Sequence, residues 1–198
     1  MERRTYSVMA VCNPLLDHLN HVSREFLEEI KAVPGTMNLV DEKKFLEIHG
    51  KLDSGRIIPG GSSANTLRGI AWLAKSRPVP SPVYFGAVGE DEAGSDYVRL
   101  LSSCGVTDRI VRKNARTGAS IVAVTPDSQR TMFTFLGASL QVGIGDVDFS
   151  LIGEASVFYC AGYMWDSPSG REIINKAAER AHQEKTIFAF DIADPFVV

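Results

Sequence analysis

Short apolar runs alternate along this sequence with longer segments whose apolar residues recur at helical spacing. The strand-length runs lie at 6–12, 83–88, 156–161 and 186–191. The helix-length segments lie at 23–31, 41–52, 63–74, 94–104 and 169–183. Strands separated by helices require crossover connections, which produce a mainly parallel sheet with helices on both faces. We therefore predict an α/β fold.

Two stretches do not follow this alternation. Residues 120–125 and 131–136 are apolar runs separated by a polar turn at 126–130, a pattern that predicts a β-hairpin. Together with residues 36–40, they suit a small separate β-layer that projects from the edge of the main sheet.

Composition excludes several classes of function. The chain has 198 residues, enough for one sizeable domain, and a formal net charge of −3, which argues against a nucleic-acid partner. Its three cysteines, Cys12, Cys104 and Cys160, have neither metal-ligand spacing nor a disulfide pattern. No apolar run reaches the roughly 20 residues that a membrane span requires, and no signal peptide is recognisable. We expect a cytoplasmic protein without a membrane partner.

The sharpest local motif is PGGSSANTLRGIAWLA at 59–74, which places two glycines directly before a helix. Adjacent glycines let the backbone adopt positive φ and approach a ligand closely, and the first turn of a helix offers N–H groups to it. Asn65 falls on that turn. A ligand site is one interpretation, and a tight turn with a serine N-cap is the other. The motif is neither GxGxxG nor a Walker A loop.

A second motif, NPLLD at 13–17, follows the first strand, where open α/β sheets bind their ligands. The carboxylate of Asp17 could accept hydrogen bonds from two vicinal hydroxyl groups. An Asx-type turn with a solvated acid is the structural alternative. A third motif, FGAVGEDEAG at 85–94, reads by itself as a loop with favourable helix-start chemistry.

These motifs together resemble the ribokinase-like (PfkB) carbohydrate and nucleoside kinases, which include ribokinase, fructokinase and adenosine kinase. NPLLD resembles the family's first-strand motif, GGSSAN at 60–65 its diglycine motif, and GAVGEDEAG at 86–94 its G-x-x-G-x-D-x-x-G motif. Thr117-Gly118, YCAGY at 159–163 and FAFDIADPF at 188–196 resemble later segments. The resemblance covers essentially the whole chain and is closest to adenosine kinases and their sugar-kinase relatives.

The resemblance implies a three-layer α/β/α fold with a small β-lid formed by segments near 13–22, 36–40 and 117–136. It also implies that Asp17 binds the hydroxyl groups of a ribose or sugar, and that apolar residues line a pocket for the base or sugar. The substrate-binding residues that it implies are Asn13, Leu15, Asp17, Gly60, Gly61, Ser62, Asn65, Leu136, Ala138, Tyr163 and Met164.

For the reaction, the resemblance implies ATP as phosphate donor and Mg²⁺ as its companion ion, with Asp191 near the nucleotide, where adenosine kinases commonly have Asn. The family's glycine-rich D-T-x-G-A-G-D-like stretch, which carries the catalytic aspartate, does not occur in this sequence. We therefore expect that aspartate beyond Val198, and we expect the 198 residues alone to be inactive. A monomer and a homodimer formed through the lid both agree with the resemblance.

Two functions remain open at this point. The chain is the N-terminal portion of a kinase that phosphorylates a hydroxymethyl group of an adenosine-like nucleoside or a sugar when a C-terminal part completes it. Alternatively, it is a truncated protein that binds a small molecule or dimerises without catalysis. An unrelated nucleotide-binding domain is disfavoured because no dinucleotide fingerprint follows the first strand.

Overall fold

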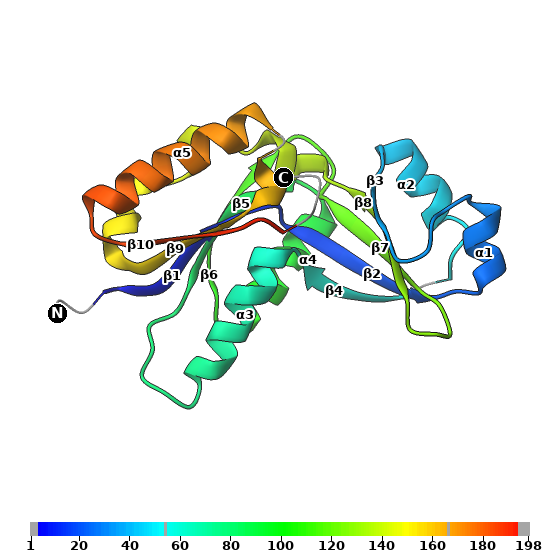
Figure 1. The fold of residues 1–198 in the computed structure, drawn as a ribbon, viewed down its shortest axis with the longest axis horizontal. Coiled ribbons are helices and arrows are strands. Elements are labelled where there is room, and N and C mark those ends of the chain that lie inside the picture. Colours follow the sequence, from blue (N-terminus) through cyan, green and yellow to red (C-terminus); the bar gives the residue numbers. More distant parts are fainter. Residues whose placement is uncertain (1–3, 54, 166, 194–198) are drawn as a thin grey trace.

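The computed structural model describes residues 4–53, 55–165 and 167–193, which form two separate sheets (Figure 1). In the first sheet all neighbouring strands are parallel. Its strands, in spatial order, are β10 (Ile187–Asp191), β9 (Ala155–Ala161), β1 (Tyr6–Val11), β5 (Val83–Gly89) and β6 (Thr107–Lys113). The central strands β1 and β5 are the most buried, as their continuous apolar sequences predict.

Helices cover both faces of this sheet. Helices α3 (Ser62–Ala74) and α4 (Glu92–Ser103) lie on one face, and α5 (Pro168–Gln183) lies on the other with a short 3₁₀ helix at Phe149–Glu154 (Figure 1). Each long helix turns an apolar stripe inward, so that side chains such as Leu67, Leu101 and Ile173 are fully buried. The predicted three-layer α/β/α fold with a mainly parallel sheet is confirmed.

The second sheet is smaller and lies beside the first (Figure 1). Its strands, in spatial order, are β3 (Met37–Leu39), β8 (Arg130–Phe135), β7 (Ala119–Val124), β2 (Leu15–His21) and β4 (Arg56–Gly60). β7 and β8 form the predicted antiparallel hairpin. Four of the strands fall within the segments 13–22, 36–40 and 117–136, whereas β4 falls outside them. Helices α1 (Arg24–Glu29) and α2 (Glu42–His49) cover one face.

Two strands carry little of the apolar signal that the alternation pattern requires. β6 has the sequence TDRIVRK because it is the edge strand of the first sheet and none of its residues is fully buried. β2 has the sequence LLDHLNH, in which polar residues interrupt the apolar ones. Charged residues on an edge strand discourage further strand pairing, which accounts for β6. β2 lies between β7 and β4 inside the second sheet, so its polar residues have another cause.

The carboxylate of Asp91 accounts for much of the structure of the motif at 85–94. Its carboxylate accepts the backbone N–H of Gly94 at 2.9 Å and thereby caps α4. The same carboxylate accepts the backbone N–H of Thr117 at 2.9 Å and the hydroxyl of that residue. The start of α4 is thus tied to the point where the chain enters β7, which confirms the helix-start chemistry and adds a link between the two sheets.

No helix in the described ranges is long and apolar enough to cross a membrane. The three cysteines are free thiols, with Cys12 and Cys160 buried.

Candidate functional site

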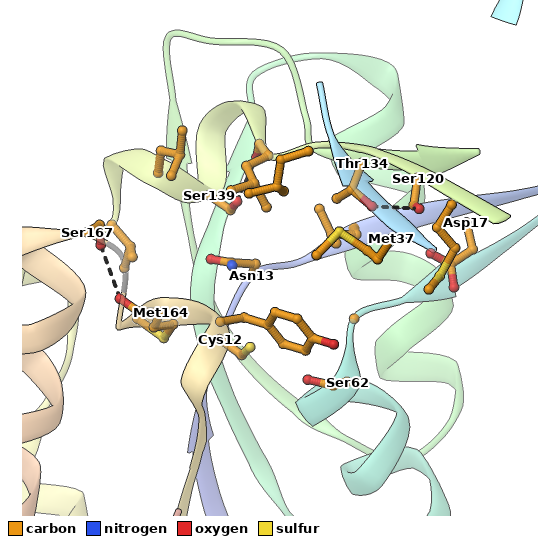
Figure 2. A pocket seen from close by; sticks show the side chains of 18 of the residues that line it. Cys12, Asn13, Asp17, Met37, Ser62, Ser120, Thr134, Ser139, Met164 and Ser167 are labelled. Carbon is orange, nitrogen blue, oxygen red and sulfur yellow. Dashed lines mark hydrogen bonds between the residues drawn. The ribbon is translucent and has the colours of Figure 1, made fainter. Parts of the chain in front are cut away.

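A cavity of about 410 Å³ opens between the two sheets, beyond the carboxyl end of β1 (Figure 2). Nine of the eleven predicted substrate-binding residues line it: Asn13, Leu15, Asp17, Gly61, Ser62, Asn65, Leu136, Tyr163 and Met164. These residues come from distant parts of the sequence, and only the packing of one sheet beside the other brings them together. The carboxyl end of a central parallel strand is also where open α/β sheets bind ligands.

Three predicted residues lie elsewhere. Gly60 lies directly against Asp17 but does not line the cavity. Ala138 is fully buried, and its neighbours Ser139 and Leu140 line the cavity instead. Asp191 is exposed at the end of β10, where it accepts a hydrogen bond from the Tyr159 hydroxyl at 3.3 Å.

The cavity also has lining residues that we did not predict: Cys12, Met37, Leu39, Ser120, Met132, Thr134, Ser139, Leu140, Val142 and Ser167. Successive side chains on a strand point to opposite faces. Met132 and Thr134 therefore share a face with Leu136, and this alternation in the sequence could have identified them. Met37 is different, because only the pairing of β3 with β8 places it opposite Met132.

The diglycine turn opens the start of α3 toward the cavity. Gly61 is the N-cap residue with φ 91°, and no side chain caps the helix, so the proposed serine N-cap is wrong. A Cβ atom at Gly61 would lie 2.6 Å from the backbone oxygen of Asn13, which requires glycine there. The first N–H groups of α3 therefore lack a side-chain partner. The Ser62 hydroxyl is buried and has no hydrogen-bond partner among the described residues.

Asp17 lies on β2, between Ile58 of β4 and Ser120 of β7, so it belongs neither to a loop nor to an Asx turn. Figure 2 shows its side chain at the cavity, on the same side as Ser62. A Cβ atom at Gly60 would lie 2.2 Å from the Asp17 carboxyl carbon, so only glycine leaves space for this side chain.

Burial raises the pKa of Asp17 to about 6, and the positive charge of Arg68 opposes this effect. None of the hydrogen bonds formed among the described residues involves the Asp17 carboxylate. A half-buried carboxylate without a donor is costly, which indicates a group kept for a ligand.

The remaining wall of the cavity is mostly apolar. Met37, Leu39 and Met132 belong to the second sheet, which besides Asp17 contributes the hydroxyl pair of Ser120 and Thr134, 2.9 Å apart, to the lining (Figure 2). The cavity thus combines carboxylate, amide and hydroxyl groups, Asp17 among them, with a lining of Leu, Met and Val side chains. This arrangement suits a ligand that has a hydroxylated part and a larger apolar or aromatic part.

The described residues do not form an evident site for ATP or a metal ion. Within these residues, no three His, Cys, Asp or Glu side chains lie close enough together to hold a metal. Asp191 is exposed and accepts hydrogen bonds from the Tyr159 hydroxyl and the Ala193 N–H, and a catalytic aspartate beyond Val198 would lie outside the described residues. Among the described residues, the cavity around Asp17 is therefore the place where the structure brings most of the predicted site residues together.

Comparison with known proteins agrees with this geometry. Residues 32–197 match the family model of the pfkB family carbohydrate kinases. A probable sugar kinase from Rhizobium etli CFN 42 superposes with a TM-score of 0.91 at 29% identity, over 98% of this chain and 58% of that one. The adenosine kinase of Sinorhizobium meliloti superposes with a TM-score of 0.88 at 29% identity and the same coverage.

A third solved structure is Anopheles gambiae adenosine kinase in complex with P1,P4-di(adenosine-5) tetraphosphate. It superposes with a TM-score of 0.85 at 27% identity, over 96% of this chain and 57% of that one. The chain thus spans less than two thirds of the length of each of these structures. Because the family model matches most of the sequence, the chain belongs to the pfkB family of carbohydrate kinases.

Proposed function

We propose that this chain forms the acceptor-binding part of an ATP-dependent kinase that phosphorylates a hydroxymethyl group of an adenosine-like nucleoside or a sugar. The observation that carries the proposal is the Asp17 carboxylate, which is half-buried, lacks a hydrogen-bond donor and lies in the cavity near the uncapped start of α3. Such a carboxylate accepts hydrogen bonds from two adjacent hydroxyl groups, as a ribose or a sugar presents them.

A nucleoside suits the cavity better than a free sugar. Leu15, Leu39, Met132 and Leu136 contribute apolar side chains to the cavity, and a planar base would bury more apolar surface against them than a sugar ring can. Two of the superposed structures are adenosine kinases. Adenosine is therefore the substrate that we favour.

ATP would supply the phosphoryl group and Mg²⁺ would neutralise the charge that develops during its transfer. This chain contributes the positioning of the acceptor, since the polar groups that line the cavity would bind the hydroxyl groups of the sugar. We place the phosphate-binding loop and the catalytic base outside residues 1–198, and we expect these residues alone to show no turnover. A cytoplasmic location, and a monomer or a dimer formed through the second sheet, remain predictions.

A non-catalytic binding protein is the second candidate, because it would use the same cavity. Titration calorimetry with adenosine, D-ribose and D-fructose tests what both candidates share, and we expect adenosine to bind most tightly. Asp17→Asn should weaken binding by about tenfold to a hundredfold through the lost charged hydrogen bonds, whereas the exposed Asp53→Asn should not. The proposal fails if none of the three compounds binds or if Asp17→Asn binds as the wild type does.

An assay of phosphate transfer from ATP, with magnesium present, complements the calorimetry. Turnover by residues 1–198 would show that the catalytic groups lie within them and would contradict our placement of the base beyond Val198.

A further inference from the structure

Arg68 connects two parts of the site without lining the cavity itself. It lies on α3, one turn after Asn65, and is half-buried. One of its guanidinium nitrogens, Nη1, donates to the Asn65 side-chain oxygen Oδ1 at 3.0 Å and to the backbone oxygen of Pro59 at 2.7 Å. Pro59 directly precedes the two glycines. The guanidinium of Arg68 thus holds both Asn65, which lines the cavity, and the turn that carries Gly60 and Gly61.

The contact with Asn65 determines which end of that amide faces the ligand. An asparagine side chain has an acceptor oxygen and a donor NH₂ group. Because the positively charged guanidinium of Arg68 needs an acceptor, the oxygen is held toward Arg68, and the NH₂ group is left for the cavity that Asn65 lines. In the reverse orientation, the NH₂ group of Asn65 would face the guanidinium of Arg68, and two hydrogen-bond donors would point at each other.

The contact with Pro59 acts on the turn. The neighbouring carbonyl oxygen of Gly60 accepts a hydrogen bond from the buried Tyr97 hydroxyl at 3.1 Å, so two consecutive carbonyl groups are held. Arg68 on α3 is the charged group that acts on Asp17. Tyr97 on α4 is kept neutral, because burial raises its pKa and the nearby charge of Asp17 raises it further. The charge of Arg68 lowers the pKa of Asp17 against the effect of burial.

We propose that Arg68 is a positioning residue that sets the donor and acceptor pattern of the site, with Asn65 fixed as a donor and Asp17 fixed as an acceptor. A ligand with two adjacent hydroxyl groups matches this pattern, because one hydroxyl donates to Asp17 while a hydroxyl oxygen accepts from Asn65. This inference rests on the proposed function, and it names a residue that never touches the substrate.

Titration calorimetry with adenosine and 2′,3′-dideoxyadenosine tests the proposal. Arg68→Met should weaken adenosine binding about tenfold, the size of one or two lost hydrogen bonds, and should leave the weaker binding of the dideoxy compound unchanged. Arg68→Lys keeps the charge but carries it on a flexible stem without the planar guanidinium that holds both contacts in place, so we expect an intermediate loss. Arg99→Met is the matched control, because Arg99 is exposed on α4 and pairs with Asp96.

The pH dependence of adenosine binding distinguishes a positioning role of Arg68 from a general loss of structure in the variant. In the wild type, adenosine binding should weaken as the pH falls through about 6, where Asp17 becomes protonated. Arg68→Met should move this midpoint to higher pH, and Arg68→Lys should leave it in place. Equal losses for adenosine and the dideoxy compound in Arg68→Met, or an unchanged adenosine affinity with an unchanged midpoint, would overturn the proposal.

A measurement on the ligand-free protein tests the role of Arg68 independently of the proposed function. NMR of the ligand-free protein follows the Asn65 side-chain amide and the ¹³C titration of the Asp17 carboxyl group. Both substitutions at Arg68 should shift the amide signal, and only Arg68→Met should raise the Asp17 titration midpoint. If wild-type protein binds neither nucleoside, the proposed function fails while these spectra still decide the role of Arg68. Unchanged spectra in both variants would reject that role.

Discussion

Replacement of Asp17 by asparagine should stabilise the ligand-free protein at neutral pH, although it weakens binding. Burial raises the pKa of this carboxyl group from its ordinary 3.8 to about 6, so the folded state favours the protonated form. Each pKa unit corresponds to about 1.4 kcal/mol. The ionised carboxylate therefore destabilises the folded protein by about 3 kcal/mol at pH values above 6, and this cost disappears as the pH falls below 3.8. Asparagine has nearly the same shape and carries no charge.

Urea unfolding between pH 4.5 and pH 8 measures this effect as a difference between the variant and the wild type. We expect Asp17→Asn to be more stable by about 1 kcal/mol at pH 4.5 and by about 3 kcal/mol at pH 8. The variant and the wild type must be compared at the same pH, because the titration of His18 changes the stability of both proteins in the direction opposite to that of Asp17. Burial lowers the pKa of His18 to about 4, so the wild type loses stability as the pH falls through the unfolded pKa of 6.5.

Asp53→Asn serves as the control, because Asp53 is exposed and its substitution should change the free energy of unfolding by no more than about 0.5 kcal/mol at any pH. A stability difference for Asp17→Asn that stays constant across the pH range would refute the reasoning. So would a variant that is less stable than the wild type at pH 8, since Asp17 would then stabilise the fold through contacts of its carboxylate.

Three further substitutions test the backbone of α3 and the cap of α4. Gly61→Ala should lower the free energy of unfolding by about 1–3 kcal/mol and abolish adenosine binding, because it combines a positive φ with a close approach to Asn13. Gly69→Ala, where a Cβ meets open space within α3, should instead stabilise by about 0.5–1 kcal/mol. Asp91→Ala should cost about 2–4 kcal/mol in urea unfolding, since it uncaps α4 and releases Thr117; a loss below about 1 kcal/mol would mean that water replaces both contacts.

The elements that could be predicted from the sequence are those whose environment is uniform along their length. The strand at 83–88 is apolar throughout because it is covered on both faces, and the long helix at 169–183 repeats its apolar residues because one side faces the core. β2 was harder to predict, since Asp17 on one of its faces lines the cavity and His18 on the other contacts Phe45 and His49 of α2. A strand that serves a site has no simple hydrophobic period.

The sequence by itself determined the α/β fold, the family and the short motifs around Asn13, Asp17 and the two glycines, because each of these depends on residues that are neighbours in the chain. Only the tertiary structure decided that β3 and β8 supply much of the apolar wall, that Ala138 is buried while Leu140 is not, and that Arg68 holds Asn65. These contacts depend on how two sheets pack beside each other, and packing joins residues whose separation in sequence carries no periodic signal.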